Sequence, residues 1–182
     1  MTQKPASGLK ALAALQSRLD AESYVEVIHE NGHCWRAYCK LNAPAVPEAI
    51  EAVKQQLSMP LPFTYEQFLL HYNGALLYYD NEYGQWGFEL YGTENLLIAN
   101  VNAQKRYEDE WALSYLVFAE SYGDADLLII DTAQMVNEGK DCRVIDGDSG
   151  YALQQWRVAA RSFSDWIDRL VVAQGAKYWR WR

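Results

Sequence analysis

Two histidines and two cysteines near the start of the chain have the atom types that bind zinc. They lie within eleven residues, as His29, His33, Cys34 and Cys39. Asn31-Gly32 separates two strand-like runs there, which predicts a β-hairpin with a two-residue loop. In that hairpin His29 would face Cys34, whereas the next pair, Glu30 and His33, would point to the opposite side of the ribbon. Cys39 would lie near the far end, opposite Tyr24. The spacing therefore predicts no metal site.

Two acidic runs resemble an ion site or a catalytic site only in part. Asp146-Gly-Asp-Ser-Gly150 starts like a calcium loop, but its twelfth position is Arg157, where such a loop needs a bidentate Glu. Gly123-Asp-Ala-Asp126, followed by Asp131, could supply a pair of carboxylates. A turn that leads into a strand explains the same residues without catalysis. Both runs are therefore predicted to be turns.

Nucleophilic and phosphate chemistry have no better support in the sequence. Ser149 stands beside Gly150 but lacks the strand-turn-helix context of a nucleophile elbow. His71, the histidine outside the hairpin, is interpreted as a packing or surface residue. The chain has no glycine-rich loop with a lysine for phosphate. We therefore predict a protein that is not an enzyme and has no catalytic residues, no metal and no cofactor.

One segment in the middle of the chain combines aromatic and acidic residues in a way that suits protein binding. Exposed aromatic side chains are favoured anchors in interfaces, and acids beside them suit a partner rich in Arg or Lys. An alternative is that the aromatic residues belong to strands and pack inward. The segment comprises Tyr78, Tyr79, Asp80, Glu82, Tyr83 and Trp86.

A second aromatic segment, Lys177-Tyr-Trp-Arg-Trp-Arg182, stands at the end of the sequence. Alternation of basic and aromatic residues can stack on nucleic-acid bases, but six residues are a short segment for that role. We expect Trp179 and Trp181 to pack on their own domain or on a second subunit. A homodimer through this tail or an edge strand stays open.

The charge of the chain is concentrated in its middle. The 182 residues carry a net charge of −8. Residues 80–148 hold fifteen acids and four bases, a net charge of −11, whereas residues 149–182 hold two acids and six bases. The plain interpretation is a well-solvated surface. A more specific one is a patch that steers a basic partner. Under either interpretation, direct binding of this region to a nucleic-acid backbone is disfavoured.

The chain order of predicted elements indicates an α+β fold. Leucines at helical spacing predict a helix over 7–20, and the hairpin follows, with strands at 24–28 and 34–39. Pro47 suits the first turn of the next helix, which ends near Met59. A further helix is predicted after Leu61-Pro62, capped by Thr64 with Gln67 and ended by Asn73-Gly74.

The second half of the chain reads mainly as strands, with one helical insert and a closing helix. Ser162, with Asp165 three residues later, predicts the start of the closing helix, and Gly175 its end. The whole predicts one domain over 1–182, a mainly antiparallel sheet packed with helices. The strands are expected at 75–79, 86–91, 115–118, 127–130, 142–145 and 151–158, and the insert at 94–110.

The residues from about Pro47 to Leu170 resemble the SUKH superfamily. The resemblance begins with the helix that contains Ile50, Val53 and Leu57, which runs into Leu61-Pro62, and it continues through Phe68 and Asn73-Gly74. The later matching pieces, in order, are Leu90-Tyr91-Gly92, Leu116–Ala119, Tyr122-Gly123-Asp124, Leu128–Asp131, Ala160–Phe163 and Trp166-Ile167. Residues 1–45 and 176–182 would be an extension and a tail outside this core. The resemblance implies an α+β fold and no catalytic residues.

What the resemblance implies for function is binding. Bacterial SUKH-like proteins are mostly immunity proteins that occlude secreted toxins, often nucleases or deaminases. Others, related to a yeast regulator of cell-wall synthesis, are regulatory or scaffold modules, and the sequence does not separate these two roles. An enzyme is the least favoured hypothesis. For a basic toxin domain, the predicted contacts are the anchors Tyr83 and Trp86 and the acids Asp80, Glu82, Glu108, Asp109, Glu110, Asp124 and Asp126.

The sequence also indicates a cellular location. The first 19 residues lack the pattern of a signal peptide, and no apolar run approaches the ~20 residues that span a membrane. Three cysteines form no disulfide framework. We expect a soluble cytoplasmic protein that does not associate with membranes.

Overall fold

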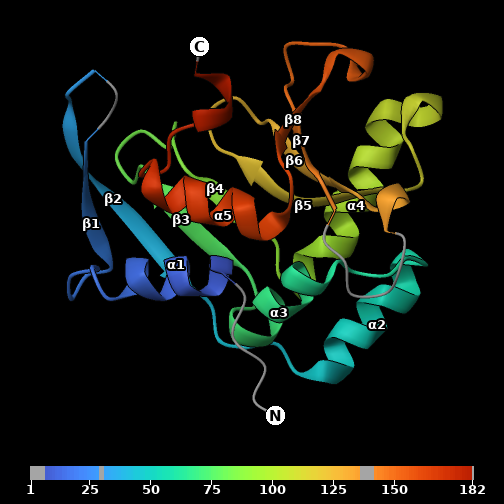
Figure 1. Ribbon diagram of the computed structural model, residues 1–182, viewed down its shortest axis with the longest axis horizontal. Coiled ribbons are helices and arrows are strands. Elements are labelled where there is room, and N and C mark those ends of the chain that lie inside the picture. The colour runs from blue at the N-terminus through green and yellow to red at the C-terminus, as the bar shows by residue number, and fades with distance from the viewer. Residues whose placement is uncertain (1–6, 29–30, 136–141, 182) are drawn as a thin grey trace.

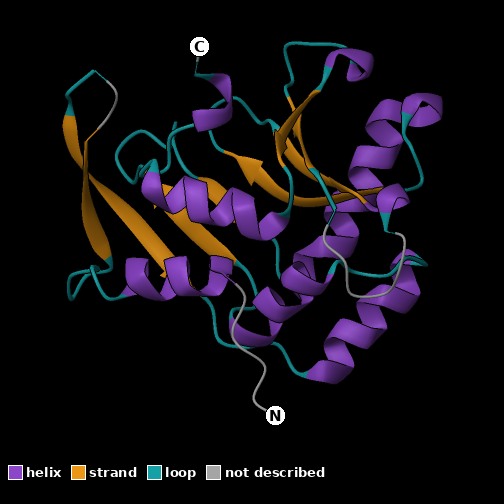
Figure 2. Ribbon diagram, in the orientation of Figure 1, coloured by secondary structure: helices purple, strands orange, loops and turns teal. Residues whose placement is uncertain are grey.

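The computed structural model describes residues 7–28, 31–135 and 142–181. In that part of the chain eight strands form one sheet in sequence order, and each strand is antiparallel to the next (Figures 1 and 2). The fold is therefore α+β, as predicted. The strands are β1 Tyr24–Ile28, β2 Cys34–Leu41, β3 Ala75–Tyr79, β4 Phe88–Leu90, β5 Tyr115–Ser121, β6 Leu127–Asp131, β7 Val144–Gly147 and β8 Arg157–Ala160.

The helices lie around this sheet. The first and last helices are side by side, and the backbone N–H of Gly8 donates a hydrogen bond of 2.9 Å to Ser164 Oγ. Two others, α2 and α4, lie together at the end of the molecule away from the β1–β2 hairpin (Figure 1). The helices are α1 Ser7–Gln16, α2 Pro47–Leu57, α3 Phe63–His71, α4 Thr93–Tyr107 and α5 Phe163–Val172.

Aromatic side chains from three elements fill the centre of the core. Tyr65 and Phe68 of α3, Phe118 of β5 and Phe163 of α5 meet with ring centroids between 5.2 and 5.9 Å apart. Tyr65 is completely buried, and its hydroxyl donates to the carbonyl of Tyr91 at 2.7 Å. Edge-to-face packing of this kind adds to the stability gained by burial. The aromatic residues predicted along α3 therefore hold the fold together.

The ends of α3 differ from the predicted capping box. The helix begins at Phe63, one residue before Thr64, and no side chain caps it. Pro62 precedes it with φ −57°, a value that already suits a helix start. At the other end, Gly74 has φ +88°, and a Cβ there would lie 2.8 Å from the backbone nitrogen of Gly92. Only glycine fits this close approach.

Asn73 has a role that the sequence did not indicate. Its Oδ1 accepts the backbone N–H of Thr93 at 2.8 Å, and its Nδ2 donates to Glu94 at 2.9 Å. Thr93 is the first residue of α4, and the first N–H groups of a helix lack partners within it. Asn73 therefore ties the end of α3 to the start of α4.

The predicted start of α5 is confirmed. Ser162 Oγ accepts the backbone N–H of Asp165 at 3.0 Å. We expect Ser162→Ala to lower the free energy of unfolding by about 1 kcal/mol, the usual effect of losing such a cap. Urea denaturation measures it. Ser162→Thr keeps the hydroxyl and should cost less, and equal losses for the two variants would contradict the capping role.

The hairpin forms as predicted, but its two strands pair in a different register. Ile28 pairs with Cys34, and Tyr24 pairs with Tyr38, so five residues connect the strands. Asn31 Oδ1 accepts the N–H of His33, which closes a turn of its own instead of a two-residue loop. The predicted facing of Cys39 and Tyr24 is therefore wrong by one residue. His29 and Glu30 lie outside the described residues.

Other boundaries shifted by a few residues. The insert ends as α4 at Tyr107, and Glu108–Glu110 form a turn of 3₁₀ helix. The last strand is 157–160 rather than 151–158, because Leu153–Gln155 form another 3₁₀ turn. None of the helices in the described ranges combines the length and the apolar character needed to cross a bilayer.

Candidate partner-binding cleft

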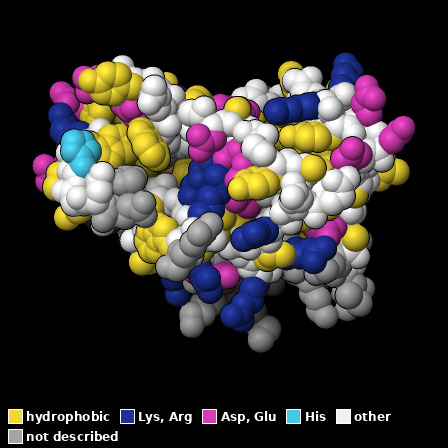
Figure 3. Space-filling model, turned by 90° about the horizontal axis from the view of Figure 1, so that it is seen from above, with side chains coloured by type: hydrophobic (Ala, Val, Ile, Leu, Met, Phe, Trp, Pro, Cys, Tyr) yellow, Lys and Arg dark blue, Asp and Glu magenta, His cyan; other side chains and the backbone are white. Residues whose placement is uncertain are grey.

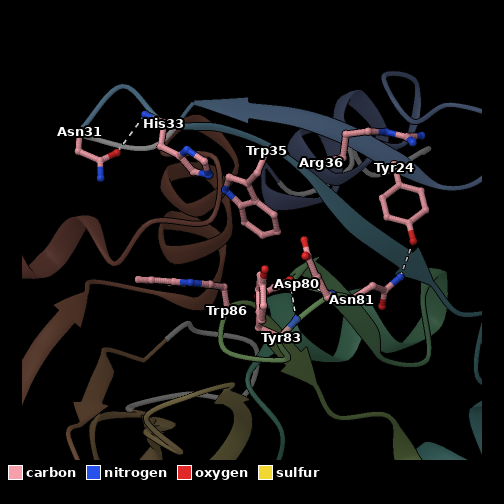
Figure 4. A pocket seen from close by; sticks show the side chains of 10 residues that line it. Tyr24, Asn31, His33, Trp35, Arg36, Asp80, Asn81, Tyr83 and Trp86 are labelled. Atoms are coloured by element: carbon pink, nitrogen blue, oxygen red, sulfur yellow. Dashed lines mark hydrogen bonds between the residues drawn. The ribbon is translucent and has the colours of Figure 1, made fainter.

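A cleft of about 650 Å³ opens between the β1–β2 hairpin and the turn that joins β3 to β4. The two walls come from segments more than forty residues apart in the sequence. Figure 4 shows Trp35 reaching from the hairpin toward the turn that carries Tyr83 and Trp86. The lining consists of aromatic, amide and charged side chains: Tyr24, Asn31, His33, Trp35, Arg36, Asp80, Asn81, Glu82, Tyr83 and Trp86.

Asp80 organises the β3–β4 turn. Its Oδ1 accepts the backbone N–H groups of Glu82 at 2.9 Å and of Tyr83 at 3.1 Å. Its own backbone N–H donates to the carbonyl of Trp86 across the turn. A carboxylate that accepts local N–H groups fixes a turn without help from a regular strand. The side chains that follow Asp80 are therefore held in place on the surface.

The aromatic residues of this segment divide into two groups. Tyr78 is buried, and its hydroxyl donates to the carbonyl of Val171. In contrast, Tyr83 is 71% exposed and Trp86 is 54% exposed. The inward-packing alternative therefore holds for Tyr78, whereas Tyr83 and Trp86 are placed as the binding hypothesis requires.

Backbone geometry next to Trp86 depends on a glycine. Gly87 has φ +117°, and a Cβ at this position would lie 2.7 Å from Cα of Tyr79. Opposite, Tyr78 itself has φ +53° at an irregularity in the β2–β3 pairing. Close approach of the two strands at Gly87 lets the chain leave the sheet at Trp86.

The hairpin wall is tied to the turn and carries its own compensated charge. Asn81 Nδ2 donates to the Tyr24 hydroxyl at 2.6 Å, which joins the two walls. Arg36 lies over the Tyr24 ring, 4.7 Å from its centroid. Its guanidinium pairs with Asp20 and Glu22, and the hydrogen bond to Asp20 raises the pKa of Arg36.

Asp80 and Glu82 leave the cleft negative. In the described part of the chain no Lys or Arg forms an ion pair with either carboxylate. The hydrogen bond from Tyr83 to Glu82 and the charge of Glu82 raise the pKa of the Tyr83 hydroxyl. The cleft therefore combines exposed aromatic surface with negative charge that no Lys or Arg of the described residues neutralises.

The remaining predicted acids do not join this site. Glu108, Asp109 and Glu110 are exposed at the end of α4, at the far end of the molecule from the hairpin (Figure 1). Glu110 accepts a hydrogen bond of 3.0 Å from Gln154. The predicted residues therefore form no continuous acidic patch.

Asp126 is a correction to the predicted binding residues. It is only 1% exposed, and its carboxylate accepts from Lys177, from Arg180 and from the backbone N–H of Ser149. Burial alone would raise the pKa of Asp126, but the hydrogen bonds from Lys177 and Ser149 and the charges of Lys177 and Arg180 lower it overall. This carboxylate has a structural role, because it is enclosed and neutralised within the protein. Asp124 is exposed, and it also pairs with Lys177.

The tail supplies these bases by docking on the domain. Trp179 lies against Phe88 and Trp166, with ring centroids 6.1 Å apart in both pairs. The predicted packing of the tail on its own domain is thus present for Trp179. Trp181 is 56% exposed and lines a smaller cleft of about 220 Å³ that also borders Trp86.

Sequence reasoning missed the hairpin wall. It considered His33 only as a metal ligand and did not consider Trp35 or Arg36. Within the residues that the structure describes, no three His, Cys, Asp or Glu side chains are grouped as metal ligands. Figure 3 shows hydrophobic side chains gathered at the hairpin end of the molecule, beside acidic and basic ones. Aromatic residues in an otherwise exposed hairpin were the available signal.

Comparison with known protein families identifies the domain that carries this cleft. The model of the SMI1/KNR4 family (SUKH-1) matches residues 44–169. The chain belongs to this family. The match agrees with the resemblance expected for about Pro47 to Leu170. SMI1/KNR4 proteins are generally not catalytic, and the family fits a protein-binding module. A search among curated protein sequences finds no match to the chain.

The cleft crosses the boundary of the SMI1/KNR4 match. The turn with Asp80, Tyr83 and Trp86 lies within the matched residues, whereas the hairpin with Trp35 lies before them. The tail from Gly175 onward lies after them. This chain therefore completes a surface of the SMI1/KNR4 core with a segment outside it.

Proposed function

We propose that this protein is a non-enzymatic immunity protein that neutralises a secreted bacterial toxin domain by binding and occluding it. The observation that carries the proposal is the cleft at the β3–β4 turn, where Tyr83 and Trp86 are exposed beside Asp80 and Glu82. Family membership supports a binding module, and the geometry of the turn supports a place for the contact. The proposed site of action is the cytoplasm.

The composition of the cleft favours a protein partner. Aromatic residues dominate the binding energy of interfaces when they sit at a preformed and rigid position. Here the hydrogen bonds of Asp80 fix the turn before any partner arrives, so the turn loses little conformational entropy on binding. The uncompensated carboxylates favour a basic surface, which suits a toxin domain of the nuclease or deaminase type. They disfavour a phosphate backbone.

Structure changes which acids should matter for binding. Glu82 and Asp80 lie in the cleft, whereas Glu108–Glu110 lie at the far end of the molecule and Asp126 is enclosed. In the proposed mechanism the partner covers the hairpin end. The distant acids contribute through long-range steering, which salt screens.

We expect Trp86→Ala to weaken toxin binding by about 2 kcal/mol, roughly thirtyfold in Kd. The indole is the largest exposed apolar side chain of the turn, and its removal leaves the Asp80 hydrogen bonds intact. Isothermal titration calorimetry against the toxin domain encoded by the neighbouring gene measures the change. Tyr151→Ala is the matched control, because Tyr151 is 61% exposed and does not line the cleft.

A growth assay tests the biological role directly. Cells that express the toxin domain should survive with the wild-type protein and should lose this protection with Trp86→Ala. Failure of the neighbouring toxin to bind, together with absence of protection, would show that immunity is the wrong role. The regulatory or scaffold role would then be the remaining account for the SMI1/KNR4 fold.

A further inference from the structure

Flat aromatic surfaces line the cleft from both walls. Trp35 comes from β2, and Tyr83 and Trp86 come from the opposing turn (Figure 4). Trp35 and Trp86 also border a second, smaller cavity together with Gly87, so the two indoles are neighbours in two hollows of the surface. Indole faces attract cations, and the attraction grows as the cation loses water. The walls therefore suit a flat, positively charged group.

Asp80 is the exception among the buried carboxylates of the described chain. Three of the four buried Asp side chains have a basic partner: Asp126 pairs with Lys177 and Arg180, Asp131 with Arg143, and Asp146 with Arg180. Asp80 is also buried, at 7% exposure, yet among the described residues the hydrogen bonds to its carboxylate come from the backbone N–H groups of Glu82 and Tyr83. A buried carboxylate without a counter-ion is costly. Because Asp80 lines the cleft, an incoming cation can supply the missing charge.

Arg36, the arginine in the hairpin wall of the cleft, already has acidic partners. Arg36 lies over Tyr24 and pairs with Asp20 and Glu22, so its charge is already met by carboxylates of its own chain. This contact is also an internal example of a guanidinium resting on an aromatic wall of the same cleft.

We propose that the cleft is an arginine pocket: it takes the guanidinium of an arginine projecting from the partner, between Trp35 and Trp86, with its charge met by Asp80 and Glu82. The source of that arginine rests on the proposed function, since it belongs to the bound toxin. Arginine fits better than lysine because its guanidinium is planar, weakly hydrated and able to stack while it donates hydrogen bonds.

The probe is a short peptide, acetyl-Gly-Arg-Gly-amide, titrated into the full protein. Indole N–H signals in a nitrogen–proton correlation spectrum report binding, with Trp35 and Trp86 assigned from Trp→Phe variants. The control peptide replaces arginine by citrulline, which has the same shape without the charge. We expect the arginine peptide to shift both indole signals and to bind about tenfold tighter than the citrulline or lysine peptide. Equal affinity for all three, or shifts confined to other tryptophans, would overturn the pocket.

Two charge-removing variants test the carboxylates without removing the turn. Asp80→Asn keeps an Oδ1 that can accept from Glu82 and Tyr83, and Glu82→Gln is its partner variant. Each variant should bind the arginine peptide severalfold more weakly than the wild-type protein does. Glu48→Gln, at an exposed position in the first turn of α2, lies outside the cleft and should leave the affinity unchanged. Unaltered indole signals in the free variants show that they fold. Wild-type affinity in both cleft variants would contradict the proposal.

The two proposals fail separately. Toxin binding without any arginine-peptide binding would remove the pocket and leave the immunity role. Arginine-peptide binding at Trp35 and Trp86 without toxin binding would keep the pocket and remove the immunity role.

Discussion

Arg180→Met is expected to lower the free energy of unfolding by about 3 kcal/mol, the range in which removing one partner of a buried ion pair falls. Arg180 Nε and Nη2 donate to Asp146 at 2.7 and 2.8 Å, and Nη2 also donates to Asp126 at 2.9 Å. Both carboxylates are buried, so the variant leaves negative charge enclosed with Lys177 as the remaining base. Methionine keeps much of the side-chain volume.

Urea denaturation at neutral pH measures this loss. The matched control is Arg157→Met, because Arg157 is exposed and pairs with no acid in the described residues. A loss below about 0.5 kcal/mol, as surface substitutions usually give, would show that the tail does not clamp the domain.

The same cluster sets a pH dependence. Because the pKa of Asp126 in the folded protein lies below its ordinary value of 3.8, its ionised form stabilises the fold. This contribution is fully present above about pH 4 and is lost as the pH falls below 3.8, through the lower pKa of the folded state. The difference between wild type and Arg180→Met should therefore shrink in acid, and a constant difference from pH 7 down to pH 2 would contradict the linkage.

Asn100→Leu should be similarly damaging, at about 3 kcal/mol. Beyond the last pair of β4 with β5, Asn100 of α4 takes the place of a strand. Its Oδ1 accepts the N–H of Val117 at 2.8 Å, and its Nδ2 donates to the carbonyl of Val117 at 2.9 Å. Leucine has nearly the same size but leaves both backbone groups buried without partners, at about 1–3 kcal/mol each.

Thermal and urea unfolding of the purified variant measure that effect. Asn102→Leu is the control in the same helix, because Asn102 is exposed. If the two leucine variants were equally stable, the hydrogen bonds to Val117 would contribute nothing net.

Local patterns predicted the elements well. Asn31-Gly32 gave the hairpin, Pro47 the first turn of α2, and Ser162 the cap of α5, because each depends on neighbours in sequence. Predictions that had to be exact to a single residue were wrong. Thr64 does not cap α3, and the hairpin register moved by one position because Asn31 closes a separate turn with His33.

The candidate site shows where sequence reasoning stops. Residue types singled out Tyr83 and Trp86, and both are exposed in the cleft. The net charge of residues 80–148 does not reveal that Asp126 is enclosed. Its basic partners, Lys177 and Arg180, come from the tail some fifty positions later. The meeting of Trp35 with Trp86 is equally non-local.

The order of the sheet also bears on how the molecule folds. Each strand pairs with the next one in the chain, so the sheet can grow one strand at a time as synthesis proceeds. The contact between α1 and α5 joins distant parts of the sequence instead, since the backbone N–H of Gly8 in α1 donates to Ser164 in α5. A nascent chain can therefore extend its sheet early, whereas α1 cannot dock on α5 until nearly the whole sequence has been made. Premature release would expose the apolar face of α1, which includes Leu12 and Leu15.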